Sequence, residues 1–192
     1  MKLNIILILF FSLPIQLYSQ VYIDSINNNE IKFKQVYDVD LKKDEIRKLV
    51  NKWIAVNFKD ANTVIKLDNE DNIILKGVFI TSALMGDMHL EQFVDYTLDI
   101  SYKDNKYKIE FYDLKKYHEI LKNYKTPVSA NTESFESYHK KRLDTSIEEN
   151  RISYKKGLKY ADSINLQIET YLDGISKALN SYVIKNMKAS DW

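Results

Sequence analysis

The sequence predicts a two-layer α+β fold in which two amphipathic helices cover one face of a largely antiparallel sheet. Several segments alternate apolar and polar residues with a period of two, which is typical of strands with one buried face. Two other segments carry apolar residues at helical spacing, and such stripes need a surface to cover. Their order along the chain is strand–helix–strand–strand–strand–strand–helix (β-α-β-β-β-β-α).

The clearest element is a hairpin over residues 92–114. Its two halves alternate regularly and meet at Asp104-Asn105, which we take as the two central residues of a tight turn. This turn sets a register that matches apolar with apolar side chains. The predicted pairs are Tyr102 with Tyr107, Ile100 with Ile109, and Leu98 with Phe111.

The first part of the chain contains the first strand and the better of the two helices. Residues 21–30 are polar and indicate a loose lead-in, and residues 32–38 alternate as a strand. Residues 40–58 predict a helix with Asp40 as its N-cap. Trp53 lies in the middle of its apolar stripe, so we interpret it as a core residue rather than a ligand-stacking one. The stripe consists of Ile46, Leu49, Val50, Trp53, Ile54 and Phe58.

Two more strands precede the hairpin. We expect them at 63–67 and 72–80, around a polar turn at 68–71. Gly77 interrupts the second strand, which indicates a bulge or a close backbone approach. Residues 81–91 lack regular alternation and predict a connecting loop, a kind of segment that often carries function.

The last part of the chain predicts a polar excursion and a long helix. Residues 115–150 are polar, and we expect an extended or partly helical path before a capping box at Thr145 and Ser146. Residues 163–187 predict the C-terminal helix, with Gly174 costing about 1 kcal/mol relative to alanine. A helix starting near residue 145 would either stop near Lys159 or fuse with the C-terminal helix. The apolar stripe consists of Ile164, Ile168, Tyr171, Leu172, Ile175, Leu179, Tyr182 and Val183.

The N-terminus predicts export. Residues 1–20 combine Lys2, an apolar run and Pro14, which is typical of a signal peptide cut after Ser19 or Gln20; an uncleaved anchor helix is the alternative. The mature chain, 21–192, would be one α+β domain with its core at 33–114, located in the periplasm or secreted. It would carry 27 basic and 27 acidic residues. This balance argues against nucleic-acid binding, and the absence of cysteine excludes disulfides, thiol nucleophiles and Cys-zinc sites.

Three segments resemble a known family. They are KDEIRKLVNKW (43–53), VIKLDNEDNIILKG (64–77) and YTLDISYKDNKYKIEFYDL (96–114). Together they resemble a family of secreted bacterial domains of unknown function with a TATA-binding-protein-like (TBP-like) fold. Asn105 stands where that family usually has a turn glycine, a mild departure because asparagine tolerates the left-handed conformation. The resemblance implies the fold and export, and it implies no activity, DNA binding or catalytic residue.

The sequence assigns no catalytic, cofactor-binding or metal-binding residue. The histidines, His89, His118 and His139, are isolated from one another in the sequence, and Asp87 with His89 is the acid–histidine pair that we consider as possible ligands. In the predicted register Asp99 lies opposite Glu110 on the polar face. Two such carboxylates could bind a cation or share a proton, or Lys108 could simply neutralise them in solvent.

Two classes of function remain open. The first is an exported non-enzymatic domain that binds a cell-envelope protein, a lipid or another apolar ligand between sheet and helices. The alternative is a hydrolase that assembles His89, Asp87 and a distant acid around the 81–91 loop. A pocket that gathers these groups would favour the hydrolase, and an enclosed apolar cavity of roughly several hundred cubic ångströms would favour ligand carriage.

Overall fold

The computed structural model describes residues 20–24, 30–119, 122–128 and 148–187 of the chain. The predicted order of strands and helices is confirmed, and two short strands and one short helix are added to it. The elements are β1 (Gln20–Asp24), β2 (Glu30–Asp38), α1 (Lys43–Asn57), α2 (Ala61–Val64), β3 (Ile65–Asp68), β4 (Asn72–Met85), β5 (Met88–Lys103), β6 (Lys106–Tyr117), β7 (Thr126–Pro127) and α4 (Glu148–Met187).

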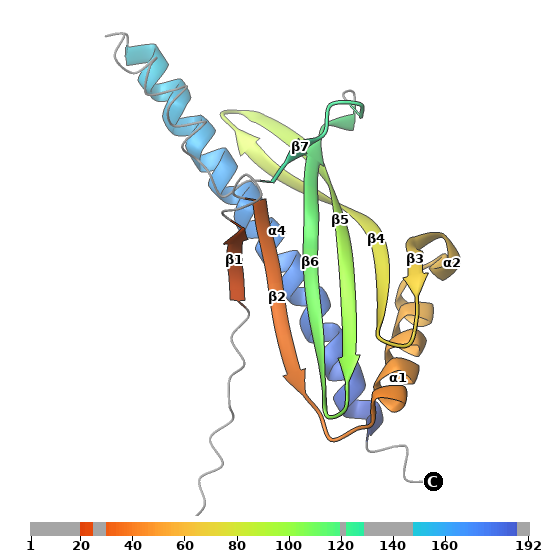
Figure 1. Ribbon diagram of the computed structural model, residues 1–192. Coiled ribbons are helices and arrows are strands. Elements are labelled where there is room, and N and C mark those ends of the chain that lie inside the picture. Colours follow the sequence, from red (N-terminus) through yellow and green to blue (C-terminus); the bar gives the residue numbers. More distant parts are fainter. Residues whose placement is uncertain (1–19, 25–29, 120–121, 129–147, 188–192) are drawn as a thin grey trace, which may run out of the picture.

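The strands form one antiparallel sheet with the helices packed against it. The order is β1-β2-β6-β5-β4-β3, and β7 pairs with the far end of β6. Helix α4 passes diagonally behind the sheet, and α1 lies at the side where β3 and β4 end the sheet (Figure 1). The two-layer α+β fold expected from the alternation is therefore present.

The β5–β6 hairpin has the predicted register. Tyr102 pairs with Tyr107, and the next two apolar pairs follow as expected. Asn105 adopts a left-handed φ of 63°, a conformation that asparagine tolerates better than most residues. The pairing continues beyond residue 114, because β6 runs to Tyr117 after a register shift between Asp95 and Thr97.

Helix α1 begins later than predicted, and Asp40 is not its cap. The N-cap residue is Lys42, whose backbone N–H donates to Glu45. The exposed N–H of Lys43 instead donates to the Oδ1 atom of Asp104 at 2.9 Å, from the β5–β6 turn 61 residues away. The prediction that Asp40 caps the helix was wrong because Asp104, which is distant in sequence, accepts the hydrogen bond from the first turn of α1.

The predicted loop over 81–91 was also wrong. Strands β4 and β5 pair without a register shift from Asn72 with Ser101 to Met85 with Met88, so the connection is a tight turn at Gly86 and Asp87. Gly86 has a φ of 68°, which glycine adopts without strain. The lead-in over 21–30 is likewise more regular than expected, since Gln20–Asp24 pairs with β2 as β1.

Three further boundaries differ from the prediction. The strand expected from Thr63 is β3 from Ile65, because residues 61–64 form α2. Within the polar excursion, β7 pairs with β6, and the N–H of Val128, just after β7, donates to the Leu114 carbonyl. The two possible helices of the C-terminal part are one continuous helix, α4; Thr145 and Ser146 lie outside the described residues.

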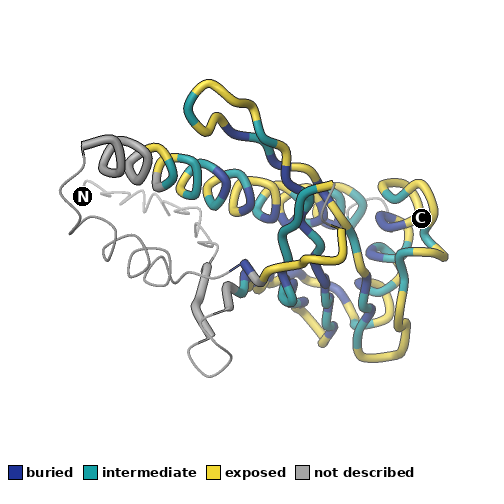
Figure 2. Tube along the Cα trace, turned by 90° about the horizontal axis from the view of Figure 1, so that it is seen from above, coloured by how far each residue is buried: buried dark blue, intermediate teal, exposed yellow. Residues whose placement is uncertain are grey.

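The core lies between the sheet and the two long helices. Buried positions recur along α4, as Figure 2 shows. They are Ile164, Ile168, Leu172, Ser176, Leu179 and Val183. Ser176 belongs to a buried polar contact, because its hydroxyl and that of Tyr37 both lie 2.6 Å from the Oε1 atom of Gln35. This contact joins α4 to β2. Among the described helices, none has an apolar stretch suited to crossing a bilayer.

Candidate binding groove at the β4 edge

An open groove of about 1070 Å³ lies at the edge of β4. It lies where β4 has left β3 and has not yet met α4. The last pairing with β3 is at Leu75 of β4. Further along, the side-chain amide of Gln167 on α4 bonds both the N–H and the C=O of Ser82, at 3.0 and 2.7 Å. Between these two points β4 is paired with β5 on one side and has no neighbouring strand among the described residues on the other.

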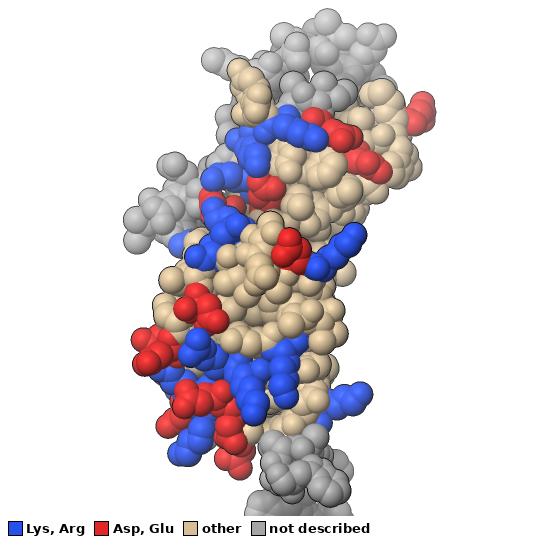
Figure 3. Space-filling view, turned by 90° about the vertical axis from the view of Figure 1, so that its right-hand side faces the viewer, with Lys and Arg blue, Asp and Glu red and all other residues tan. Residues whose placement is uncertain are grey.

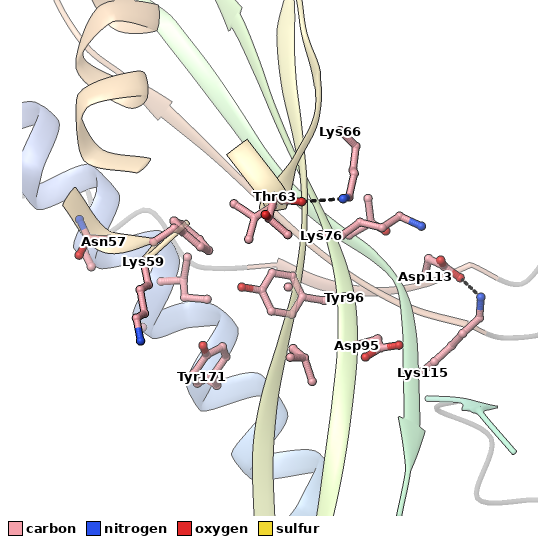
Figure 4. A pocket seen from close by; sticks show the side chains of 18 of the residues that line it. Asn57, Lys59, Thr63, Lys66, Lys76, Asp95, Tyr96, Asp113, Lys115 and Tyr171 are labelled. Carbon is pink, nitrogen blue, oxygen red and sulfur yellow. Dashed lines mark hydrogen bonds and ion pairs between the residues drawn. The ribbon is translucent and has the colours of Figure 1, made fainter. Parts of the chain in front are cut away.

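The inner wall of the groove is largely apolar. Tyr96 lies across the sheet from Gly77, and Tyr171 projects from α4 toward the same space (Figure 4). Stacking of Tyr171 on Phe79, with ring centroids 3.9 Å apart, holds it in place. Aromatic surface of this kind binds apolar groups well. The rest of this wall comes from α1, α2 and α4: Trp53, Phe58, Val64, Gly174, Ile175 and Ala178.

Two glycines shape the groove, each in a different way. A Cβ atom at Gly77 would overlap the ring of Tyr96, so only glycine lets that ring lie over the strand. The sequence signal at Gly77 is thereby explained as a close approach, made by a side chain rather than by backbone. Gly174 faces the groove from α4, and a Cβ there would meet no atom within 4 Å. Gly174 therefore leaves space where other helical residues would fill it.

The two tyrosine hydroxyls of the groove stay protonated at neutral pH. Burial raises the pKa of Tyr96 far above its ordinary value, and the hydroxyl donates toward that of Tyr171. Burial also raises the pKa of Tyr171. Neither phenol is therefore a base near pH 7. What the pair offers a ligand is ring surface and neutral hydrogen-bonding groups.

The rim of the groove carries an excess of lysines. Lys115 pairs with Asp113 at 2.7 Å, and Lys125 pairs with Asp95. The other three lysines of the rim are Lys59, Lys66 and Lys76, and none of them forms a salt bridge with a described carboxylate. Lys66 donates to the Thr63 carbonyl, and its side chain extends on the same side as Lys76 (Figure 4). On the side of the molecule that β3 and β4 border, basic and acidic groups are interspersed with uncharged surface (Figure 3).

The residues considered from sequence lie elsewhere. His89 is exposed beside the β4–β5 turn, and Asp87 is within that turn. No group of three histidine or acidic side chains able to hold a metal occurs in the described residues. His118 contacts the Glu91 carbonyl and the side chain of Gln92, and it lines neither the groove nor the β4–β5 turn. His139 is outside the described residues.

Asp99 and Glu110 face each other as predicted; a lysine pairs with Glu110, and uncharged side chains donate hydrogen bonds to Asp99. Lys108 forms an ion pair with Glu110 at 2.7 Å, and Asn72 donates to both oxygens of Asp99 at 3.1 and 3.2 Å. Ser101 donates to Asp99 as well. These contacts favour the interpretation of a solvated polar surface over a cation site.

Sequence reasoning missed most of the groove. The sequence marks Gly77 as unusual, but it indicates Tyr96 only as part of the alternating hairpin and Tyr171 only as part of a helical stripe. Their meeting depends on how α4 crosses the sheet, which no local pattern encodes. A usable signal was present in Val78 and Ile80, two apolar residues at outward-facing positions of a predicted strand, which are 52% and 56% exposed.

Comparison with known proteins identifies the fold. Residues 33–117, which run from within β2 to the end of β6, match the family "Domain of unknown function (DUF4468) with TBP-like fold". These residues form a DUF4468 domain. The resemblance seen in the sequence is thereby confirmed, together with the TBP-like fold.

Two solved structures are also similar to the chain. A DUF4468 family protein from Bacteroides ovatus is 13% identical, with a TM-score of 0.46 over 78% of this chain and 90% of that one. A TBP-like protein from Parabacteroides distasonis is 14% identical, with a TM-score of 0.48 over 79% of this chain and 93% of that one. Among curated proteins there was no match.

Proposed function

We propose that this DUF4468-containing chain is a non-enzymatic binding domain whose groove at the β4 edge takes up an apolar part of a cell-envelope partner. The observation that carries the proposal is the groove itself. Its volume of about 1070 Å³ exceeds what a single side chain needs, and aromatic residues form its inner wall. Its tyrosines are neutral, so they suit contact and hydrogen bonding rather than proton transfer.

The groove favours a partner that enters from the side over a ligand enclosed in the core. It opens at the sheet edge, and its rim carries charged side chains on both sides of the strand (Figure 4). An enclosed ligand would be surrounded by apolar atoms on all sides. A partner that inserts only one apolar portion can keep its polar remainder at this rim.

A dye-binding experiment tests the use of the groove. Anilinonaphthalene sulfonate is apolar and anionic, so it suits both the aromatic wall and the lysines. Replacing Gly174 by leucine fills open space in the groove while it raises helix propensity by roughly 1 kcal/mol, which keeps α4 folded. We expect Gly174→Leu to weaken dye binding about tenfold or more.

The matched control for this variant is Ser181→Leu. Ser181 is exposed two turns further along α4 and does not line the groove. It should leave the affinity for the dye unchanged. If Gly174→Leu binds the dye as tightly as the unmodified protein does, the groove is not the binding site.

We further propose that the domain acts outside the cytoplasm, after removal of residues 1–20. The composition of this segment supports the proposal. The mass of the protein recovered from a bacterial envelope fraction tests it. A mass equal to that of residues 20–192 or 21–192 is expected, and recovery of the full-length chain from the cytoplasm would contradict export.

A further inference from the structure

We infer that the partner is an extended polypeptide segment, a run of apolar residues flanked by acidic ones, which adds to β4 as an extra strand. The inference rests on the proposed function, because it assigns an occupant to the same groove. Three features of the structure carry it: the unpaired edge of β4, the apolar surfaces on both sides of that edge, and the lysines around it.

The unpaired edge presents backbone donors and acceptors. Ser82 directs its N–H and C=O away from β5, toward Gln167. Backbone direction alternates along an antiparallel strand, and β4 pairs with β5 without a register shift, so Ile80 and Val78 direct theirs the same way. Pairing with β3 ends at Leu75, and among the described residues no backbone hydrogen bond outside the strand ladders involves Val78 or Ile80. The amide of Gln167 thus marks the position that a neighbouring strand would occupy.

The side chains of an added strand would find apolar surface on both faces. Those directed inward would enter the groove near Tyr171 and Ile175. Those directed outward would lie beside Val78 and Ile80, whose side chains are about half exposed. Recognition by strand addition has this form, because backbone bonds supply affinity and alternating side chains supply specificity.

The charges select an acidic peptide over a second copy of the chain. Edge-to-edge pairing of two β4 strands would bring two sets of the same lysines, Lys59, Lys66 and Lys76, to one interface. Lysines brought together repel one another and oppose association. Carboxylates of a partner placed beside the same lysines would attract them and favour association. A partner with acidic residues next to its apolar run therefore fits the edge better than the chain fits itself.

Binding of a synthetic peptide tests the inference. The probe is a blocked, fluorescently labelled peptide with a run of valines between glutamates, and its counterpart has lysines in place of the glutamates. Fluorescence anisotropy should show the glutamate peptide binding about tenfold more tightly at low salt, with the difference shrinking as salt is added. Lys76→Glu should reduce this preference, whereas Lys52→Glu, on the exposed side of α1 away from the groove, should not.

Amide exchange and a proline variant test the strand itself. Peptide binding should slow hydrogen exchange at the N–H groups of Val78 and Ile80. Proline is tolerated at an edge position whose N–H is unpaired, so Ile80→Pro should fold and should weaken peptide binding about tenfold or more. The control Ile80→Thr keeps the N–H but loses apolar side-chain surface, so it should weaken peptide binding clearly less than Ile80→Pro does. Both variants should still bind the dye, because Ile80 does not line the groove.

The outcomes separate this inference from the proposed function. Strand addition would be overturned if the protein bound the dye but not the peptide. It would also be overturned if the peptide bound without protecting the Val78 and Ile80 amides. In either case the groove would remain a binding site. Protection of these amides in the free protein, together with a dimer in sedimentation equilibrium, would show that a second copy occupies the edge. That result too would overturn the inference. If the unmodified protein bound neither the dye nor the peptide, the proposed function would be contradicted as well.

Discussion

Single residues in this fold are set by contacts between segments that lie far apart in sequence. Asp104 accepts a hydrogen bond from the first turn of α1, and Gly77 makes room for the ring of Tyr96. In each case the local sequence indicates a requirement, a cap for the helix or a glycine in the strand. The tertiary structure decides which residue accepts the hydrogen bond and which side chain lies over the glycine.

The cap of α1 gives a direct test at this scale. Asp104→Ala removes the acceptor for the Lys43 N–H, and we expect it to lower the free energy of unfolding by about 1 kcal/mol. Asp40→Ala, at the position that the sequence favours, should change it by less than about 0.5 kcal/mol. Urea denaturation of both variants measures the difference. A larger effect at Asp40 would mean that the helix begins where the sequence placed it.

Gly77 provides a second test. Gly77→Ala places a methyl group inside the space of the Tyr96 ring, so we expect a destabilisation of about 1–3 kcal/mol from overpacking. The cost should largely disappear when Tyr96 is first replaced by leucine, because the two effects then share one contact. A double-mutant cycle measures this coupling. Additive effects of the two substitutions would show that the ring does not lie over the glycine.

At the scale of elements, the sequence was sufficient wherever one face of an element is buried along its whole length. The β5–β6 register and the buried stripes of α1 and α4 follow from alternation and helical spacing. The 81–91 segment was mistaken for a loop because its strands project beyond the core there. His89, Leu84 and Met88 are exposed, so the alternation that marks a half-buried strand is missing.

Helix α1 offers the corresponding prediction. Trp53 is 4% exposed and packs edge-on against Phe58, with ring centroids 5.8 Å apart. Trp53→Ala should therefore cost roughly 3–5 kcal/mol of unfolding free energy. Val56→Ala, on the exposed side of the same helix, should cost less than about 0.5 kcal/mol. Chemical denaturation measures both, and a small effect at Trp53 would mean that the buried face of α1 is misassigned.

At the scale of the whole molecule, the groove exists because three elements stop short of one another. β3 ends its pairing at Leu75, α4 reaches the β4 edge only at Gln167, and α2 fills the corner between them incompletely. The sequence predicts β3 and α4, but it predicts neither α2 nor the gap. A gap depends on the relative placement of elements, whereas local patterns report only the face that each one buries.

Alkaline pH should destabilise the fold through its buried tyrosines. Burial raises the pKa values of Tyr96, Tyr102 and Tyr107 well above their ordinary value near 10. The native state then holds protons that the unfolded state releases above pH 10. The stability they contribute is complete below about pH 10 and is lost as the pH rises further, by up to about 1.4 kcal/mol per tyrosine per pH unit.

Urea denaturation between pH 8 and 11 measures this loss, and a phenylalanine variant assigns it. The Tyr102 hydroxyl has no hydrogen-bond partner among the described residues, so Tyr102→Phe should be tolerated at pH 8 and should lose less stability at pH 11. Tyr124→Phe is the control, because Tyr124 is 78% exposed. Equal losses in all three proteins would show that Tyr102 ionises as freely in the native state as in the unfolded one.

The most direct test of the account is amide hydrogen exchange along β4 in the free protein. Gly77 and Phe79 direct their N–H groups toward β5, and Val78 and Ile80 direct theirs to the open edge. We predict slow exchange at the first pair and much faster exchange at the second. Equal protection at all four positions would mean that the edge is already occupied, and the binding site proposed here would not exist.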